Sequence, residues 1–407
     1  AIGRALWNPI LPGLGDWPGV NWLVVAYGAP AAALGAGAFA LSARRDRPRA
    51  VLELGAALFG AVFVVFEVVH AFVGADLAAA RALLPRDGGW PSAAHQQAMA
   101  LTACLTLALA LLALAYAALR RRTGGAIFAG AETAATGAMA LAGALGLGVA
   151  VNPLFNGLPI IGQPVFNEIL VCYVGPGVAL AALAWRIGTE PEFNGLTRIL
   201  QGLALILGAF GAGLIVQHLF SGPNLPAPMP HDARYFAAVA HVLSLLVLAA
   251  VVAMWRERRP GATLNAGFAA LVALAMAWFA LRLGVMLNPF LDGSSTPGPI
   301  LFNRILWGYG PVAAGFLALA ALTRQLAPEG PAIARPPALA MAGALAAALG
   351  GFLLVRQALH GPSLHSALPV TLAEAGIYGV AAIAAASLFG GRRTGDSGAA
   401  TQTAARD

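Results

Sequence analysis

The stretch AHQQAMALTACLTLALALLALAYAALRRR, residues 94–122, determines the fold class of this 407-residue chain. Residues 94–119 contain no acidic residue and no arginine, and three arginines follow directly. A helix needs about 20 residues to cross a hydrocarbon core of roughly 30 Å. The stretch therefore predicts a transmembrane helix that ends in a cluster of positive charge.

Comparable stretches recur along the whole chain. Hydrophobic residues make up 59% of the sequence and charged residues only 10%, whereas soluble domains carry about 25% charged residues. The sequence therefore predicts an all-α fold, a polytopic transmembrane helix bundle of about 11 spans. The predicted spans are residues 20–43, 50–73, 94–119, 126–150, 165–186, 196–219, 234–255, 264–287, 301–323, 337–358 and 370–390.

The basic residues, all of them arginine, gather mainly beside the odd-numbered spans. Loops 151–164 and 288–300, on the other side, contain none. Because positive loops stay in the cytoplasm, the start of the chain is predicted to be periplasmic and the C-terminus cytoplasmic. The arginines concerned are Arg44, Arg45, Arg47, Arg49, Arg120, Arg121, Arg122, Arg186, Arg198, Arg256, Arg258, Arg259, Arg324, Arg335, Arg392 and Arg393.

The same composition indicates the location and the partners. Abundant alanine and the exclusive use of arginine suggest a bacterial genome rich in G and C, so the predicted location is the bacterial inner membrane. The net charge of +7 is spread over short loops and forms no continuous patch. We therefore predict the lipid bilayer as a partner, with a small-molecule or lipid ligand or other membrane subunits as further candidates, and no nucleic acid.

Three segments of the sequence share one pattern. They are WNPILPGLGDWPGVNWLVVAYGAP (7–30), VNPLFNGLPIIGQPVFNEILVCYVGP (151–176) and LNPFLDGSSTPGPILFNRILWGYGP (287–311). In each copy an Asn-Pro pair ends a span, a second Asn follows, and a Tyr lies six residues beyond it. The Asn-Pro pairs are Asn8 and Pro9, Asn152 and Pro153, and Asn288 and Pro289; the second Asn is Asn21, Asn167 or Asn303, and the Tyr is Tyr27, Tyr173 or Tyr309.

A second element closes the next span of each copy: HAFVG (70–74), HLFSG (218–222) and QALHG (357–361). The copies define a four-helix unit, and an even number of spans makes them parallel, related by an axis along the membrane normal. The predicted division is residues 1–122 for repeat 1, which lacks its first helix, 123–259 for repeat 2, 260–393 for repeat 3, and 394–407 for a disordered cytoplasmic tail. The incomplete first copy predicts that the chain is part of a longer protein.

The chemistry of the repeated pattern predicts its local structure. Proline donates no amide hydrogen bond and disfavours helix in the preceding residue, so Asn-Pro is predicted to stop a helix, with the Asn side chain bonding nearby backbone. The later Gly-Pro pairs at 175–176 and 310–311 lie inside spans and are predicted to kink them. Tyr173 and Tyr309 are predicted to donate their hydroxyls to the carbonyls freed at these breaks.

This combination of Asn-Pro, loop, Asn, Tyr and the His-x-Phe-x-Gly element resembles the bacterial membrane proteins grouped as domain of unknown function 2339. The likeness extends up to Arg393. It implies a long, many-helix inner-membrane protein of which this chain is a C-terminal portion, and it implies no activity. Gln357 replaces the histidine found at His70 and His218, so no site of three histidines follows from the pattern.

Ionisable residues inside spans are expensive and usually face the interior of a bundle. Glu67 and His70 share one helical face, and Glu168 and Arg304 occupy the same repeat position. We predict a periplasm-facing polar pocket that binds a small molecule or lipid; a purely structural role in capping and pairing is the alternative for each residue. The predicted ligand-binding residues are Asn167, Glu168, Asn303, Arg304, Glu67, His70, His218 and Arg356.

Three functions remain open from the sequence. The first is binding or transport through that pocket, the second is a scaffold or accessory subunit of a membrane complex, and the third is a membrane-embedded enzyme acting on a lipid-linked envelope substrate, with Glu67, His70 and Glu168 as its best candidates. No nucleotide-binding, dinucleotide-binding, hydrolase or metalloprotease fingerprint is present. Cys104 and Cys172 lie in apolar runs, so neither a disulfide, a metal site nor a cofactor is predicted.

Overall fold

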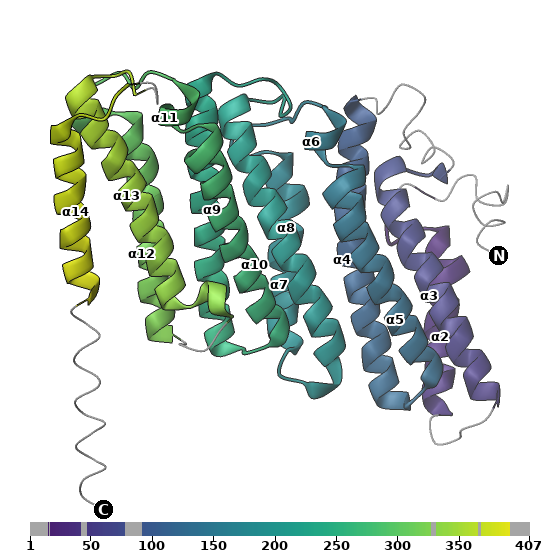
Figure 1. Ribbon diagram of the computed structural model, residues 1–407. Helices are drawn as coiled ribbons and strands as arrows, with labels where there is room; N and C mark the ends of the chain where they lie inside the picture. Colours follow the sequence, from purple (N-terminus) through teal and green to yellow (C-terminus); the bar gives the residue numbers. More distant parts are fainter. Residues whose placement is uncertain are drawn as a thin grey trace, which may run out of the picture.

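Figure 1 shows the computed structural model as a row of upright helices. The structure describes residues 15, 17–41, 47–77, 92–326, 331–364 and 368–390. Asn8, Pro9 and the tail 394–407 predicted to be disordered lie outside these ranges. The α-helices are α2 (Ala29–Ala40), α3 (Arg47–Val73), α4 (Ser92–Thr123), α5 (Ala126–Leu141), α6 (Pro153–Asn156), α7 (Gly175–Ile187), α8 (Asn194–Ser221), α9 (His231–Arg258), α10 (Ala262–Trp278), α11 (Pro289–Asp292), α12 (Arg304–Leu326), α13 (Pro336–His360) and α14 (Leu372–Gly390).

Several of these helices continue into wider or tighter turns. The π-helical segments precede or follow long helices, and the 3₁₀ turns lie in loops. The π-helical segments are η1 (Val24–Gly28), η3 (Ala142–Ala150), η4 (Leu170–Val174) and η6 (Phe279–Met286), and the 3₁₀ turns are η5 (Pro191–Phe193), η7 (Ile300–Phe302) and η8 (Ala332–Ala334).

Nine helices in the described ranges are long and apolar enough to cross a membrane. Two shorter apolar helices, Val24–Ala40 and Leu372–Ala381, coincide with the first and last predicted spans. The all-α membrane bundle is therefore confirmed, while the count of eleven spans stays a prediction. The nine helices are Arg47–Val73, Ala94–Thr123, Ala126–Asn156, Leu170–Ile187, Pro191–Ser221, His231–Arg258, Ala262–Asp292, Arg304–Leu326 and Pro336–His360.

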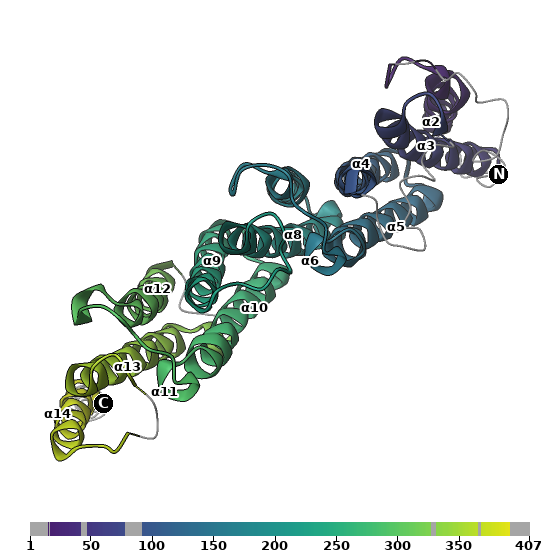
Figure 2. The same ribbon diagram turned by 90° about the horizontal axis from the view of Figure 1, so that it is seen from above.

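The helices follow one another along the row broadly in chain order, and α9 also packs against α12 (Figure 2). Seen from above, α2 and α3 lie at one end and α13 and α14 at the other (Figure 2). The buried apolar side chains form two large adjoining clusters, one between Ala38 and Leu225 and one between Leu205 and Leu364, and the partly buried Trp255 packs against both. A third, small cluster consists of Leu23 and Phe66. Each helix is thus held mainly by its neighbours in the sequence.

Glycines let neighbouring helices approach closely at one repeated crossing. A Cβ added at Gly211 of α8 would lie 3.2 Å from Cβ of Tyr173, and one at Gly350 of α13 would lie 2.8 Å from Cβ of Tyr309. Each glycine lies seven residues before the polar residue of the second element, His218 or Gln357. In lipid, helix association depends on such close packing, because burial from water contributes little there. The correspondence supports the predicted repeat, although its boundaries stay a prediction.

The proline breaks differ between the copies. In the second copy the π-helical segment η4 ends directly before Gly175 and Pro176, and in the first copy η1 ends two residues before Pro30. In the third copy α12 continues through Pro311 without a change of helix type. A π turn absorbs a backbone irregularity such as a missing amide donor, and only the first two copies use it.

Candidate functional site

The Asn-Pro pairs join two helices at each of the two described junctions. Asn152 Oδ1 accepts the amide N–H of Leu154 at 3.0 Å, and its Nδ2 donates to the carbonyl of Gly148 at 3.1 Å. Asn288 repeats both bonds, to residues 290 and 284, at 3.0 and 3.1 Å. One side chain therefore ends a π-helical segment and caps the short helix α6 or α11.

The repeated tyrosines form hydrogen bonds to these π-helical segments. Tyr173 donates its hydroxyl to the carbonyl of Leu147 in η3 at 2.7 Å, and Tyr309 donates to Leu283 in η6 at 2.5 Å. The prediction that each Tyr bonds its own Gly-Pro break is therefore wrong. Helical side chains project outward toward neighbouring helices, so each hydroxyl reaches a carbonyl in the π-helical segment of the neighbouring helix.

The second Asn of each copy caps the following helix. Asn167 Oδ1 accepts from the amide of Ile169 at 2.9 Å, and its Nδ2 donates to carbonyls within the preceding loop. Asn303 Nδ2 instead reaches Gln357 Oε1 at 2.6 Å. Asn21 Nδ2 reaches Glu67 Oε2 at 3.1 Å. In the first and third copies this Asn thus ties the start of one span to the end of the next.

The first copy holds Glu67 and His70 together beneath its loop. His70 donates from Nε2 to the carbonyl of Gly15 at 2.9 Å, and Glu67 Oε2 accepts the amide of Gly19 at 3.1 Å. Glu67 Oε1 is buried and has no hydrogen-bond partner among the described residues.

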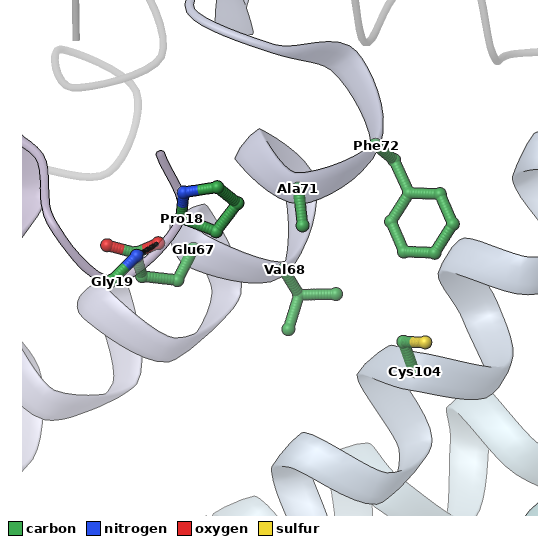
Figure 3. Close-up of a pocket in the computed structure, with 7 residues that line it drawn as sticks. All are labelled: Pro18, Gly19, Glu67, Val68, Ala71, Phe72 and Cys104. Carbon is green, nitrogen blue, oxygen red and sulfur yellow. Dashed lines mark hydrogen bonds between the residues drawn. The ribbon is translucent and has the colours of Figure 1, made fainter. Parts of the chain in front are cut away.

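A hollow of about 330 Å³ borders this carboxylate (Figure 3). Figure 3 shows the carboxylate beside Gly19, while Val68, Phe72 and Cys104 form an apolar wall away from it. Glu67 is the only predicted binding residue that lines it, and the hollow is widely open. The lining residues are Pro18, Gly19, Glu67, Val68, Ala71, Phe72 and Cys104.

Glu168 and Arg304 lie in different surroundings despite their shared repeat position. Glu168 Oε1 accepts the amide of Ile161 at 3.2 Å. Burial raises the pKa of the Glu168 carboxyl, and the bond from Ile161 opposes that shift. The carboxylate is therefore held within its own loop.

Arg304, in α12, instead bonds to α9 and to the loop that follows α11. Its Nη1 donates to Asp232 Oδ1 at 3.0 Å and to His231 Nδ1 at 2.9 Å, and Nη2 donates to Ser294 Oγ. His231 donates from Nε2 to Asp292 Oδ2 at 2.8 Å. No spacing in the sequence predicts this cluster, because its members come from four separate elements: α9, α11, the loop that follows α11, and α12.

Arg356 forms a fully buried ion pair with Glu374. Arg356 Nη1 lies 2.9 Å from Glu374 Oε1, and both side chains have no exposed surface. Arg356 Nη2 also donates to the carbonyl of Leu368 at 2.7 Å. His360 Nε2 donates to Glu374 Oε2 at 3.0 Å, and Tyr378 donates its hydroxyl to Oε1 at 2.8 Å. The pair anchors α14 to α13.

The eight predicted binding residues are therefore distributed over separate clusters. Glu67 and His70 lie on α3 at one end of the row, and Arg356 lies on α13 at the other (Figure 2). His218, on α8 between them, donates from Nδ1 to the carbonyl of Gly222 at the end of its own helix, at 2.9 Å. Each of the eight residues contacts a structural partner nearby. Only small subsets of the eight lie in the same cluster.

A larger groove lies between α10–η6 and α13, where the sequence predicted no site. Its volume is about 510 Å³. Every lining residue is apolar, so in the sequence they are indistinguishable from the rest of a span. The lining residues are Met276, Phe279, Ala280, Gly284, Val285, Ala338, Met341, Ala342, Leu345 and Leu349.

Comparison of the copies explains the groove. Ala342 lies fifteen residues before Gln357, and Leu203 lies fifteen before His218, so the two correspond. In the second copy Leu203 fills this position against η3, since a Cβ at Gly143 would lie only 2.6 Å from its Cδ1.

The next position of the groove differs in the same way. Leu349 and Phe210 lie eight residues before Gln357 and His218. The Phe210 ring reaches the space beside Gly148, where an added Cβ would lie 3.4 Å from it. The third copy therefore carries smaller side chains on α13 than the second copy carries on α8, and a larger one on η6, where Phe279 stands in place of Gly143. The groove remains open between them.

Potential metal ligands are scattered. Within the described ranges, no three His, Cys, Asp or Glu residues come together as a metal site would require. Cys104 is exposed and Cys172 is buried, and both are free thiols.

These features define a polytopic all-α membrane protein built around repeated Asn-Pro junctions. The chain belongs to the family described as Predicted membrane protein (DUF2339), whose model matches residues 3–235. The match covers the first two copies of the pattern, whereas the likeness inferred from the motifs extends further, to Arg393. No curated protein and no solved structure matches the chain.

Proposed function

We propose that this chain binds a lipid or another apolar small molecule that enters sideways from the bilayer. The groove between α10–η6 and α13 carries the proposal. Its volume of about 510 Å³ lies within the range of about 300–1,000 Å³ typical of ligand sites. Three rim residues, Val285, Met341 and Leu345, are more than half exposed on helices apolar enough to cross a membrane.

The lining of the groove indicates the chemistry of the occupant. It offers only apolar side chains and one glycine, so a polar solute would lose its hydration without gaining a hydrogen bond. An acyl chain has no such loss. The polar clusters give weaker support to transport through the bundle or to catalysis, because Glu67, His70 and Glu168 are bonded to their own loops.

Filling the groove is expected to remove the lipid held there without disturbing the fold. The double variant Ala342→Leu/Leu349→Phe installs the side chains that the second copy carries at these positions. Lipid molecules retained per chain after mild detergent extraction would be counted by mass spectrometry. We expect the variant to retain about one lipid molecule fewer per chain than the unmodified chain, because the affinity of the groove falls by about ten-fold or more, corresponding to about 1.4 kcal/mol.

Ala347→Leu serves as the matched control, because Ala347 is exposed on the opposite face of α13 and does not line the groove. It should leave retention unchanged. Equal retention in the groove variant and the control would rule out the groove as the binding site.

A scaffold or accessory subunit is the second candidate function. The elongated arrangement of the helices supports it (Figure 2). Many large apolar side chains, such as Val178, Val247 and Leu317, are exposed on these helices and can contact lipid or other membrane helices. A partner recovered in stoichiometric amount after gentle extraction would favour this function, and a monomer that retains lipid would favour the first.

We also propose that the arginine-rich ends of the helices face the cytoplasm of a bacterial inner membrane. A chain with Cys104→Ala and Cys172→Ala would receive one new cysteine, either Thr189→Cys near Arg186 or Ser295→Cys beside the Asn-Pro junction. An impermeant maleimide added to intact spheroplasts should label only the Ser295→Cys chain. Labelling of Thr189→Cys alone would reverse the proposed orientation.

A further inference from the structure

One arginine lies inside an apolar span without an acidic partner. Arg282 belongs to η6, within the membrane-length helix Ala262–Asp292, and is only partly buried. Its guanidinium lies over the ring of Trp278, with Cζ 5.0 Å from the ring centroid. Among the described residues no hydrogen bond or ion pair to the guanidinium of Arg282 is formed. A charged side chain within a membrane-spanning helix is costly and usually pairs with another group, so it needs compensation from elsewhere.

Two further polar groups gather at the same place. The ring of His241, on α9, contacts Trp278 edge-on at a centroid distance of 5.4 Å. The indole Nε1 of Trp278 is buried and has no acceptor among the described residues. The interface of α9 with α10–η6 thus collects hydrogen-bond donors and positive charge without supplying an anion.

The second copy shows that the repeated fold does not require these residues. Gly146 lies six residues before Asn152, as Arg282 lies six before Asn288, and Ala142 corresponds in the same way to Trp278. Gly146 packs closely against α4, since an added Cβ would meet Thr102 Cγ2 at 2.7 Å. An arginine and a tryptophan therefore occupy in the third copy positions that need only small residues for helix packing.

Arg282 lies close to the end of its helix that adjoins the Asn-Pro junction. It lies four residues before the end of η6 at Met286, about 6 Å along the helix at 1.5 Å per residue. Arg234, exposed in the first turns of α9, lies two turns before His241 on the same face. Basic side chains thus extend from the membrane surface to the level of Arg282.

We infer that Arg234, His241, Trp278 and Arg282 bind the phosphate group of an anionic phospholipid at the interface of α9 with α10–η6. The guanidinium fork matches the oxygens of a phosphate. The lipid supplies the negative charge that the helices lack, and the site is reached from the bilayer because Arg282 is partly exposed on a span. The site lies on another side of α10 from the apolar groove and does not depend on that groove being occupied.

Bromine-labelled lipids test the inference directly, because they quench tryptophan fluorescence on contact. The purified chain would be titrated with brominated phosphatidylglycerol or brominated phosphatidylcholine. The signal of Trp278 is the difference between the unmodified chain and Trp278→Phe. We expect this signal to be quenched at a mole fraction of phosphatidylglycerol about five-fold lower than of phosphatidylcholine.

Charge variants separate a specific site from general attraction. Arg282→Gln should remove the preference for phosphatidylglycerol. Arg282→Lys keeps the positive charge and should retain part of the preference. This partial retention would show that the loss in Arg282→Gln is due to the lost charge and not to misfolding. Arg258→Gln, exposed at the other end of α9, should retain all of it. The groove variant Ala342→Leu/Leu349→Phe should also retain the preference, which distinguishes this site from the groove.

Three results would overturn the inference. The first is equal quenching of Trp278 by both lipids in the unmodified chain. The second is a preference that survives Arg282→Gln. The third is displacement of phosphatidylglycerol by millimolar inorganic phosphate, which would assign the site to a soluble anion instead of a lipid.

Discussion

Replacing Glu374 by leucine is expected to destabilise the packing of α14 on α13 by about 3–5 kcal/mol, because it leaves the charge of Arg356 buried without its acidic partner. Arg356 has no exposed surface and lies 2.9 Å from the carboxylate. His360 and Tyr378 would also lose the oxygens that they bond. Unfolding in bicelles with increasing denaturing detergent measures the loss, and hydrogen exchange in α14 locates it.

A double variant distinguishes loss of the pair from loss of packing volume. Arg356→Met/Glu374→Leu removes both charges, and replacing a whole buried pair by apolar side chains is often neutral or stabilising. It should recover most of the stability lost in Glu374→Leu. A double variant as unstable as the single one would show that the ion pair itself contributes little.

An exposed ion pair provides the control. Arg121 contacts Glu190 at 2.7 Å, with the two side chains 50% and 44% exposed. Such pairs contribute about 0–1 kcal/mol, so Glu190→Leu should change the stability by no more than that. A large effect there would contradict the assignment of the Arg356 effect to burial.

The sequence predicted the architecture because its signals are local and repeated. Runs of apolar residues and the proline chemistry of Asn152 and Asn288 act within a few residues, and the structure contains both the helices and the capping bonds expected from them. The family resemblance, drawn from the same residues, is confirmed over residues 3–235.

The site was less predictable because its determinants are distant contacts. Arg356 was singled out, but its partner Glu374 is reached only after the chain turns back through Leu368. The groove is lined on α13 by side chains that are smaller than their counterparts, such as Ala342 for Leu203. Smaller apolar residues within an apolar span form no recognisable sequence motif. The acceptor of Tyr309 was wrongly assigned because a sequence does not show which carbonyl of a neighbouring helix the hydroxyl reaches.

The second large expected effect comes from removing the hydrogen bond between Tyr309 and the carbonyl of Leu283. Tyr309→Phe should destabilise the chain by about 1–3 kcal/mol, because the carbonyl of the buried Leu283 loses its only side-chain donor among the described residues. Tyr173→Phe should have a similar effect at Leu147. Denaturing-detergent titration measures both variants.

Tyr235 is the matched control for the loss of a hydroxyl. Its ring is fully buried in the same apolar cluster, and its Oη has no partner among the described residues. Tyr235→Phe therefore removes an unsatisfied polar atom and should be neutral or stabilising. A loss equal to that of Tyr309→Phe would show that any removed hydroxyl matters and that the bond to η6 does not.

The two tyrosines should nevertheless differ in their effect on ligand binding. Leu283 lies beside Gly284 and Val285, which line the groove, so release of η6 in Tyr309→Phe should also lower lipid retention. Tyr173→Phe releases η3, where Leu203 already fills the corresponding space, and retention should stay unchanged. Equal loss of retention in both variants would mean that retention follows the overall stability of the chain. The hydrogen bond of Tyr309 to η6 would then have no specific effect on the groove.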